Sequence, residues 1–88
     1  MELGTKKKMQ SLAKQFPDVW FKDGAEFAQG YEQTIWTGEG SYIGDVNAFD
    51  YYGYGNTMGI NPTLEKALNK LGLFAEFYDA GTVFLYNK

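Results

Sequence analysis

Residues 61–87 read NPTLEKALNKLGLFAEFYDAGTVFLYN, and this stretch decides the fold. Asn61 is a preferred helix N-cap, Pro62 suits the first helical position, and Gly72 suits the residue after a helix. Between them, apolar side chains recur at the spacing of one helix face: Leu64, Ala67, Leu68 and Leu71. The sequence therefore predicts a helix that begins after Asn61 and ends before Gly72.

The residues after this helix have the composition of two strands. Residues 74–78 and 82–86 are rich in aromatic and β-branched side chains, which favour strands. Asp79-Ala80-Gly81 separates them, and a three-residue hairpin loop commonly has Gly in a left-handed conformation. We therefore predict a C-terminal helix followed by a β-hairpin, with Gly81 left-handed.

Another helix is predicted near the N-terminus. Thr5 is a suitable cap, Pro17 ends the segment, and apolar residues again follow one face: Met9, Leu12, Ala13 and Phe16. The lysines at residues 6–8 lie in its first turn, where positive charge opposes the helix dipole. We therefore expect residues 1–5 to be frayed.

The segment between the two helices favours strands. Residues 19–22 and 31–37 contain many aromatic and β-branched side chains, and Asp23-Gly24 is a hairpin-turn signal. A glycine-rich turn then lets residues 41–43 pair back, while residues 46–52 are either a further strand or an irregular segment. The whole chain is expected to be one α+β domain, residues 1–88. Its antiparallel sheet would have four to six strands, with both helices packed on one face.

Composition excludes several kinds of chemistry. The chain has neither Cys nor His, which removes thiolate nucleophiles and the residue most often used in acid–base catalysis. Ser11 and Ser41 have no His to activate them. Arg is also missing, and Arg supplies the forked donors that read guanine and phosphate. We therefore expect no enzyme activity and no cofactor, and the absence of Arg weighs against a nucleic-acid reader. The chain has no apolar run near the roughly 18 residues of a membrane span and no signal-peptide pattern, so a cytoplasmic protein is predicted.

Charge and aromatic residues gather in one segment. Every charged residue from 23 to 61 is acidic, and many aromatics share that segment. Tyr and Trp are enriched at interface hot spots, and carboxylates around them steer toward a basic partner. The predicted partner-binding residues are Trp36, Glu39, Tyr42, Asp45, Asp50, Tyr51, Tyr52 and Tyr54.

Three catalytic or ligand-binding interpretations of the same residues are less well supported. A carboxylate pair is available among four residues, Glu32, Glu39, Asp45 and Asp50, but their spacing does not set two of them face to face. Residues 45–50 offer oxygen ligands for calcium, yet lack the glycine and distal glutamate of a calcium loop. The glycines of residues 53–59 do not match a dinucleotide or phosphate-binding fingerprint. A turn and a loop explain the last two segments better.

Three short segments carry a resemblance. Trp36-Thr37-Gly38-Glu39-Gly40, Ala48-Phe49-Asp50-Tyr51-Tyr52 and the run from Ala75 to Thr82 resemble small, uncharacterised proteins of phages and mobile elements. The resemblance implies a context in which small acidic proteins bind and inhibit host defence or nucleic-acid machinery. It assigns no residue a role.

The function expected from the sequence is that of a non-enzymatic binding or inhibitor module. It would offer an acidic, aromatic surface to a basic protein, such as one that handles nucleic acid. Binding of single-stranded nucleic acid through exposed aromatics is the first alternative. A structural or assembly protein of a particle, in which sheet edges pair between copies, is the second.

Overall fold

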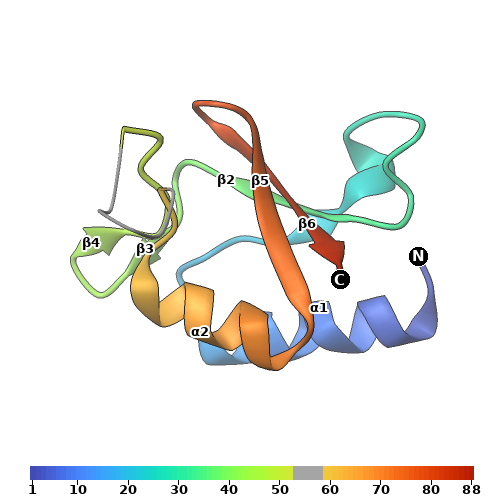
Figure 1. Cartoon of the computed structure of the whole chain (residues 1–88), viewed down its shortest axis with the longest axis horizontal. Coiled ribbons are helices and arrows are strands. Elements are labelled where there is room, and N and C mark those ends of the chain that lie inside the picture. Colours follow the sequence, from blue (N-terminus) through green and yellow to red (C-terminus); the bar gives the residue numbers. More distant parts are fainter. Residues whose placement is uncertain (53–58) are drawn as a thin grey trace.

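The computed structural model describes residues 1–52 and 59–88. Two helices, α1 (Leu3–Gln15) and α2 (Pro62–Lys70), accompany a short 3-10 turn, η1 (Gly24–Glu26). A four-stranded antiparallel sheet has the order β1-β2-β6-β5, with strands Lys22–Asp23, Ile35–Gly38, Thr82–Asn87 and Leu73–Asp79. A separate two-stranded sheet pairs β3 (Tyr42–Ile43) with β4 (Val46–Asn47). The α+β class and the C-terminal hairpin are thereby confirmed (Figure 1).

The C-terminal helix and hairpin follow their local sequence signals. The Asn61 side chain accepts a hydrogen bond from the Thr63 amide at 2.9 Å, and Gly72 takes a φ of 70° after the last turn. The predicted three-residue loop is wrong, however. Asp79 pairs with Thr82, which leaves the two-residue turn Ala80-Gly81 and a bulge after Phe77. Gly81 is not left-handed, because the bulge rather than the turn absorbs the extra residue.

The N-terminal helix begins earlier than predicted. It starts at Leu3, and Glu2 occupies the cap position without a capping side-chain bond. Thr5 lies inside the first turn, where it is buried and accepts a hydrogen bond from the Asn87 side-chain amide at 3.0 Å. Its hydroxyl therefore joins the helix to β6 instead of capping the helix.

The hairpin predicted at Asp23-Gly24 is also wrong. Gly24 begins η1, whose first free amide bonds the Asp23 carboxylate, and the pairing strand β2 starts only at Ile35. Side-chain and backbone bonds around Gly24 explain the long connection: its amide donates to Thr34 O at 2.9 Å, and a Cβ there would overlap Thr34 and Tyr31.

Residues 41–43 do not pair back onto residues 31–37 as expected. The amide of Glu39 donates to Gly81 O at 3.0 Å, and the amide of Tyr42 donates to Asp18 O at 3.0 Å. These bonds lead the chain away from β2 and into the separate β3–β4 hairpin. Phe49 then forms an isolated bridge with Ile60, which ties the segment after β4 to the start of α2.

The main core lies between the helices and one face of the sheet. Figure 1 shows α1 and α2 on the same side of the strands. Alternate residues of β2, β5 and β6 face this core, as strand geometry requires. The buried cluster combines residues from both helices, the sheet and the connecting segments: Leu12, Phe16, Val19, Ile35, Ala48, Phe49, Ile60, Leu64, Ala67, Leu68, Leu73, Val83 and Leu85.

Candidate functional site

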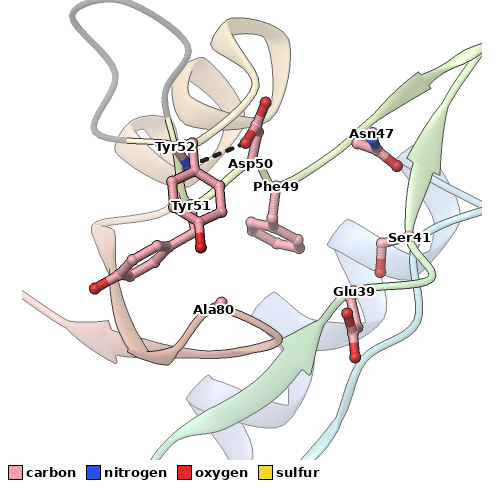
Figure 2. A pocket seen from close by; sticks show the side chains of 8 residues that line it. All are labelled: Glu39, Ser41, Asn47, Phe49, Asp50, Tyr51, Tyr52 and Ala80. Carbon is pink, nitrogen blue, oxygen red and sulfur yellow. Dashed lines mark hydrogen bonds between the residues drawn. The ribbon is translucent and has the colours of Figure 1, made fainter.

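A partly open hollow of about 310 Å³ lies between the β3–β4 side of the molecule and the β5–β6 turn. It brings together residues as far apart in the sequence as Glu39 and Ala80. The described residues that line it are Glu39, Ser41, Asn47, Phe49, Asp50, Tyr51, Tyr52 and Ala80 (Figure 2). Four of the predicted partner-binding residues therefore meet at one place: Glu39, Asp50, Tyr51 and Tyr52.

The position of Glu39 is set by its own backbone. Its amide donates to Gly81 O at 3.0 Å, and its carbonyl accepts a hydrogen bond from the Trp20 indole N–H at 2.8 Å. The side chain then lies against the β5–β6 turn, where a Cβ on Gly81 would come within 2.8 Å of the Glu39 carboxyl group. Glycine at position 81 thus leaves room for this carboxylate.

The opposite wall is built by the segment that follows β4. The Asp50 amide donates to Gly59 O at 2.8 Å, and the Ala48 amide donates to Ser41 O at 2.9 Å. One carboxylate oxygen of Asp50 accepts the Tyr52 amide at 3.0 Å, a bond drawn in Figure 2. This side-chain turn fixes Asp50 and Tyr52 relative to each other.

The two tyrosines present their rings differently. Tyr51 packs edge to face on Phe77, with ring centroids 5.2 Å apart, and is 52% exposed. Tyr52 is 90% exposed and meets Tyr51 at 90° with 5.5 Å between centroids. Tyr51 packs on Phe77 of β5, and Tyr52 packs on Tyr51. Both rings therefore lie at the mouth of the hollow, with much of their surface exposed to solvent. Such rings provide contact area at low entropic cost.

The electrostatics of the hollow are one-sided. Glu39 and Asp50 are the charged groups among the described residues that line it, and none of those residues is basic. The hollow can therefore attract cations by its two carboxylates, and the tyrosine faces reinforce that preference.

Ser41 is the unusual member of the lining. The residue is 1% exposed, and its hydroxyl oxygen has no hydrogen-bond partner among the described residues. Figure 2 shows this hydroxyl turned toward the space between Phe49 and Glu39. A buried hydroxyl without a partner costs about 1–3 kcal/mol, so the floor of the hollow contains a polar group with unused hydrogen-bonding capacity.

Trp36 does not belong to this hollow. It lies on the face of the four-stranded sheet opposite to the main core, because it pairs with Lys22 and Phe84 while its neighbours Ile35 and Thr37 face inward. On that outer face it joins a cluster of aromatic rings in edge-to-face and stacked contacts: Trp20, Phe27, Tyr31, Trp36, Tyr78 and Phe84.

The outer aromatic cluster of these six residues forms a second, smaller core around Phe84. This ring is 1% exposed, although it points away from the helices, and Tyr31 stacks on it at 4.3 Å between centroids. At the edge of the cluster the Lys22 ammonium lies 5.6 Å from the Trp20 ring and 5.3 Å from the Trp36 ring. These distances fall within cation–π range, so the Lys22 ammonium interacts with both indole rings.

The remaining predicted site residues lie elsewhere. Asp45 forms the two-residue β3–β4 turn with Gly44, and neither Asp45 nor Tyr42 lines the hollow. Tyr54 lies outside the described residues. Sequence reasoning missed Ser41, Asn47, Phe49 and Ala80 as lining residues. Of these, only Ser41 carries a signal in the sequence, its hydroxyl group, and that signal indicates a nucleophile and not a pocket wall.

The described residues contain no group of three or more Asp or Glu side chains that would hold a metal ion. Within residues 1–52 and 59–88, the calcium interpretation of residues 45–50 is therefore not supported by a cluster of carboxylates. Asp45 lies in a hairpin turn, and the Asp50 carboxylate accepts a hydrogen bond from the Tyr52 amide. The glycine-rich segment 53–59, predicted to be a connecting loop without a phosphate-binding fingerprint, lies outside the described residues except for Gly59. Of the helices described, none has the length and apolarity needed to cross a membrane.

Comparison with known proteins gives no relative: no family model, no curated protein and no solved structure matches this chain. The resemblance to phage and mobile-element proteins therefore stays a prediction.

Proposed function

We propose that this chain is a non-enzymatic binding module that docks a basic protein at the acidic hollow between Glu39 and Tyr52. One observation carries the proposal: two carboxylates and two exposed tyrosine rings, from different segments, surround one hollow that has no basic residue among its described lining. Aromatic rings of this kind supply the buried contact area of a hot spot. The carboxylates speed association with a positive surface and select against acidic partners.

The proposed partner is a basic protein, and the phage-like resemblance favours a host protein that handles nucleic acid. Such proteins expose positive grooves, because they neutralise phosphates. An acidic aromatic surface competes for the same groove. Trp36 is left out of the proposed interface, since its ring is already packed in the outer aromatic cluster.

The experiment compares two double variants that remove the same charge. Glu39→Gln/Asp50→Asn neutralises the hollow, whereas Glu26→Gln/Glu76→Gln neutralises two exposed carboxylates that do not line it. The partner is identified by cross-linking in cells and mass spectrometry, and its affinity for each purified variant is then measured by calorimetry. We expect the first variant to bind about tenfold more weakly, which corresponds to about 1.4 kcal/mol, and the second to bind as the unaltered chain does.

Two results count against this function. Equal affinity for both double variants would mean that the hollow is not the docking surface. A partner with an acidic surface, or a complex whose affinity does not fall as salt rises, would remove the electrostatic argument.

Single-stranded nucleic-acid binding is a second candidate, favoured by one observation. The outer aromatic cluster brings two tryptophans together with a cation, Lys22. Bases stack on exposed aromatic faces in a positive groove, so oligonucleotides at low salt should quench the fluorescence of Trp20 or Trp36. Absence of quenching under these conditions removes this candidate. The edge-to-face contact between the two indoles also argues against it, because the two rings already pack on each other.

A further inference from the structure

We propose that the hollow is a pocket for a single arginine side chain of the partner, with Glu39, Asp50 and Ser41 as the groups that receive its guanidinium. This inference rests on the proposed function and names the chemical group that the hollow selects.

With the Ser41 hydroxyl counted, Glu39, Asp50 and Ser41 offer four acceptor atoms not used by the bond to Tyr52, one more than the three N–H donors of an ammonium ion. Glu39 and Asp50 together present four carboxylate oxygens, one of which already accepts the Tyr52 amide. A guanidinium has five N–H donors in a rigid planar fork, whereas an ammonium has three on one centre. A quaternary ammonium has no N–H donor and would leave every acceptor unused. A planar fork with five N–H donors can therefore use more of these acceptors than an ammonium can.

The walls suit a flat cation. Tyr51 and Tyr52 meet at 90°, so their rings form a corner beside the carboxylates. Guanidinium groups stack on aromatic faces, which adds cation–π attraction to the hydrogen bonds. The volume of about 310 Å³ lies at the lower end of the roughly 300–1,000 Å³ typical of small-molecule sites. It suits one inserted side chain rather than a large cofactor.

Ser41 is the independent observation that points to a ligand. Its hydroxyl is buried, has no partner among the described residues, and is turned toward the space between the lining residues Phe49 and Glu39 (Figure 2). Unpaired buried polar groups are rare and call for a missing partner. Because this oxygen is sealed from solvent, the lining side chains must part as the guanidinium enters. The hydroxyl can then accept one of its N–H groups.

The test uses three capped tripeptides with the ¹⁵N-labelled full chain. They are Gly-Arg-Gly, its lysine counterpart and its citrulline counterpart, which keeps the shape of arginine without the charge. We expect the arginine peptide to shift the amide signals of Ser41, Asp50 and Tyr52 saturably, with a dissociation constant at least tenfold lower than that of the citrulline peptide. The lysine peptide should bind at least threefold more weakly than the arginine peptide. Equal binding of the three peptides, or shifts confined to the outer aromatic cluster, would overturn the proposal.

Ser41→Ala separates ligand binding from structure. The substitution removes an unpartnered hydroxyl, so the melting temperature of the free chain should stay the same or rise, while affinity for the arginine peptide should fall at least threefold. A purely structural role would instead lower the melting temperature and leave the affinity of the remaining folded chain unchanged. Glu39→Gln keeps the size of the side chain and should also weaken the arginine peptide.

The two proposals fail in distinguishable ways. In one case, the partner protein binds the Glu39→Gln/Asp50→Asn variant weakly and the Ser41→Ala variant normally, while the arginine peptide does not bind. The docking surface then stands, and the arginine pocket is refuted. If the peptide binds as expected but the partner binds all variants equally, the pocket stands and the proposed function is refuted.

Discussion

The outer aromatic cluster should behave as a second core, and Phe84→Ala tests this. Phe84 lies on the sheet face opposite the helices, where an exposed aromatic would contribute little to stability. Its ring is nevertheless 1% exposed, stacked on Tyr31 and surrounded by Phe27 at 5.0 Å and Tyr78 at 5.9 Å between centroids. Removing the ring leaves a cavity under these neighbours, because β6 is hydrogen-bonded on both sides and cannot shift to fill it.

The expected magnitude follows from burial. Truncating a buried Phe to Ala costs about 3–5 kcal/mol, and the total stability of a chain of this length is about 4–13 kcal/mol. Phe74→Ala is the matched control: the same chemical change on the same sheet face, at a ring that is 37% exposed and stacked on Tyr86 alone among the described rings. Its expected cost is about 1 kcal/mol, the scale of one aromatic pair.

Urea unfolding followed by far-ultraviolet circular dichroism measures both variants. The account predicts that Phe84→Ala lowers the free energy of unfolding by at least 2 kcal/mol more than Phe74→Ala, about the difference between the two burial costs. Equal losses would refute the conclusion that the outer face holds a second core. Trp36 would then be available to a partner after all.

Three further variants test separate parts of the fold. Burial, followed by the charges of Glu76 and Tyr31, raises the pKa of Tyr86 above its ordinary value of 10.0. The contribution of Tyr86 to the free energy of unfolding is therefore complete below pH 10.0 and is lost as the pH rises through the folded-state pKa. Tyr86→Phe should accordingly show a smaller fall in melting temperature at alkaline pH than the unaltered chain. Gly38→Ala should cost about 1–3 kcal/mol or more in urea unfolding, because its methyl group would overlap the Gly81 carbonyl oxygen; a tolerated alanine would contradict this close approach. Asn61→Ala should cost about 1 kcal/mol in the same assay by removing the α2 cap, and Asn61→Ser should restore most of it.

The C-terminal half of the fold could be predicted because its signals are local. Asn61, Pro62 and Gly72 mark the ends of α2 by their own conformational preferences, and two β-rich runs joined by a short turn predict a hairpin. The pairing of β2 with β6 joins residues 35–38 to residues 82–85. No local pattern encodes such a contact, so the sequence predicts the wrong partners for the middle strands.

The candidate site was predictable in composition but not in extent. Glu39, Asp50, Tyr51 and Tyr52 were found because acidic and aromatic residues share one segment. Trp36 was grouped with them by sequence proximity, whereas strand alternation places its ring on the outer sheet face. The choice between the two faces depends on which strand pairs with β2, and that information is not local.

Ser41 could not be recognised from the sequence as part of a pocket floor. Its burial depends on the β3–β4 hairpin packing beside the segment that carries Phe49, and its lack of a partner is a property of that packing. In the sequence it is one of two serines without a histidine. Its role as an unpartnered hydroxyl appears only when these segments are brought together.

The most direct test of the account is a map of the bound surface by amide and indole chemical-shift changes, recorded as the identified basic partner is added to the ¹⁵N-labelled chain. The docking proposal predicts the largest changes at Glu39, Ser41, Asp50 and Tyr52, with the Trp36 indole signal unmoved. Changes centred on Trp36 and Tyr78, with the signals of the hollow unmoved, would contradict it.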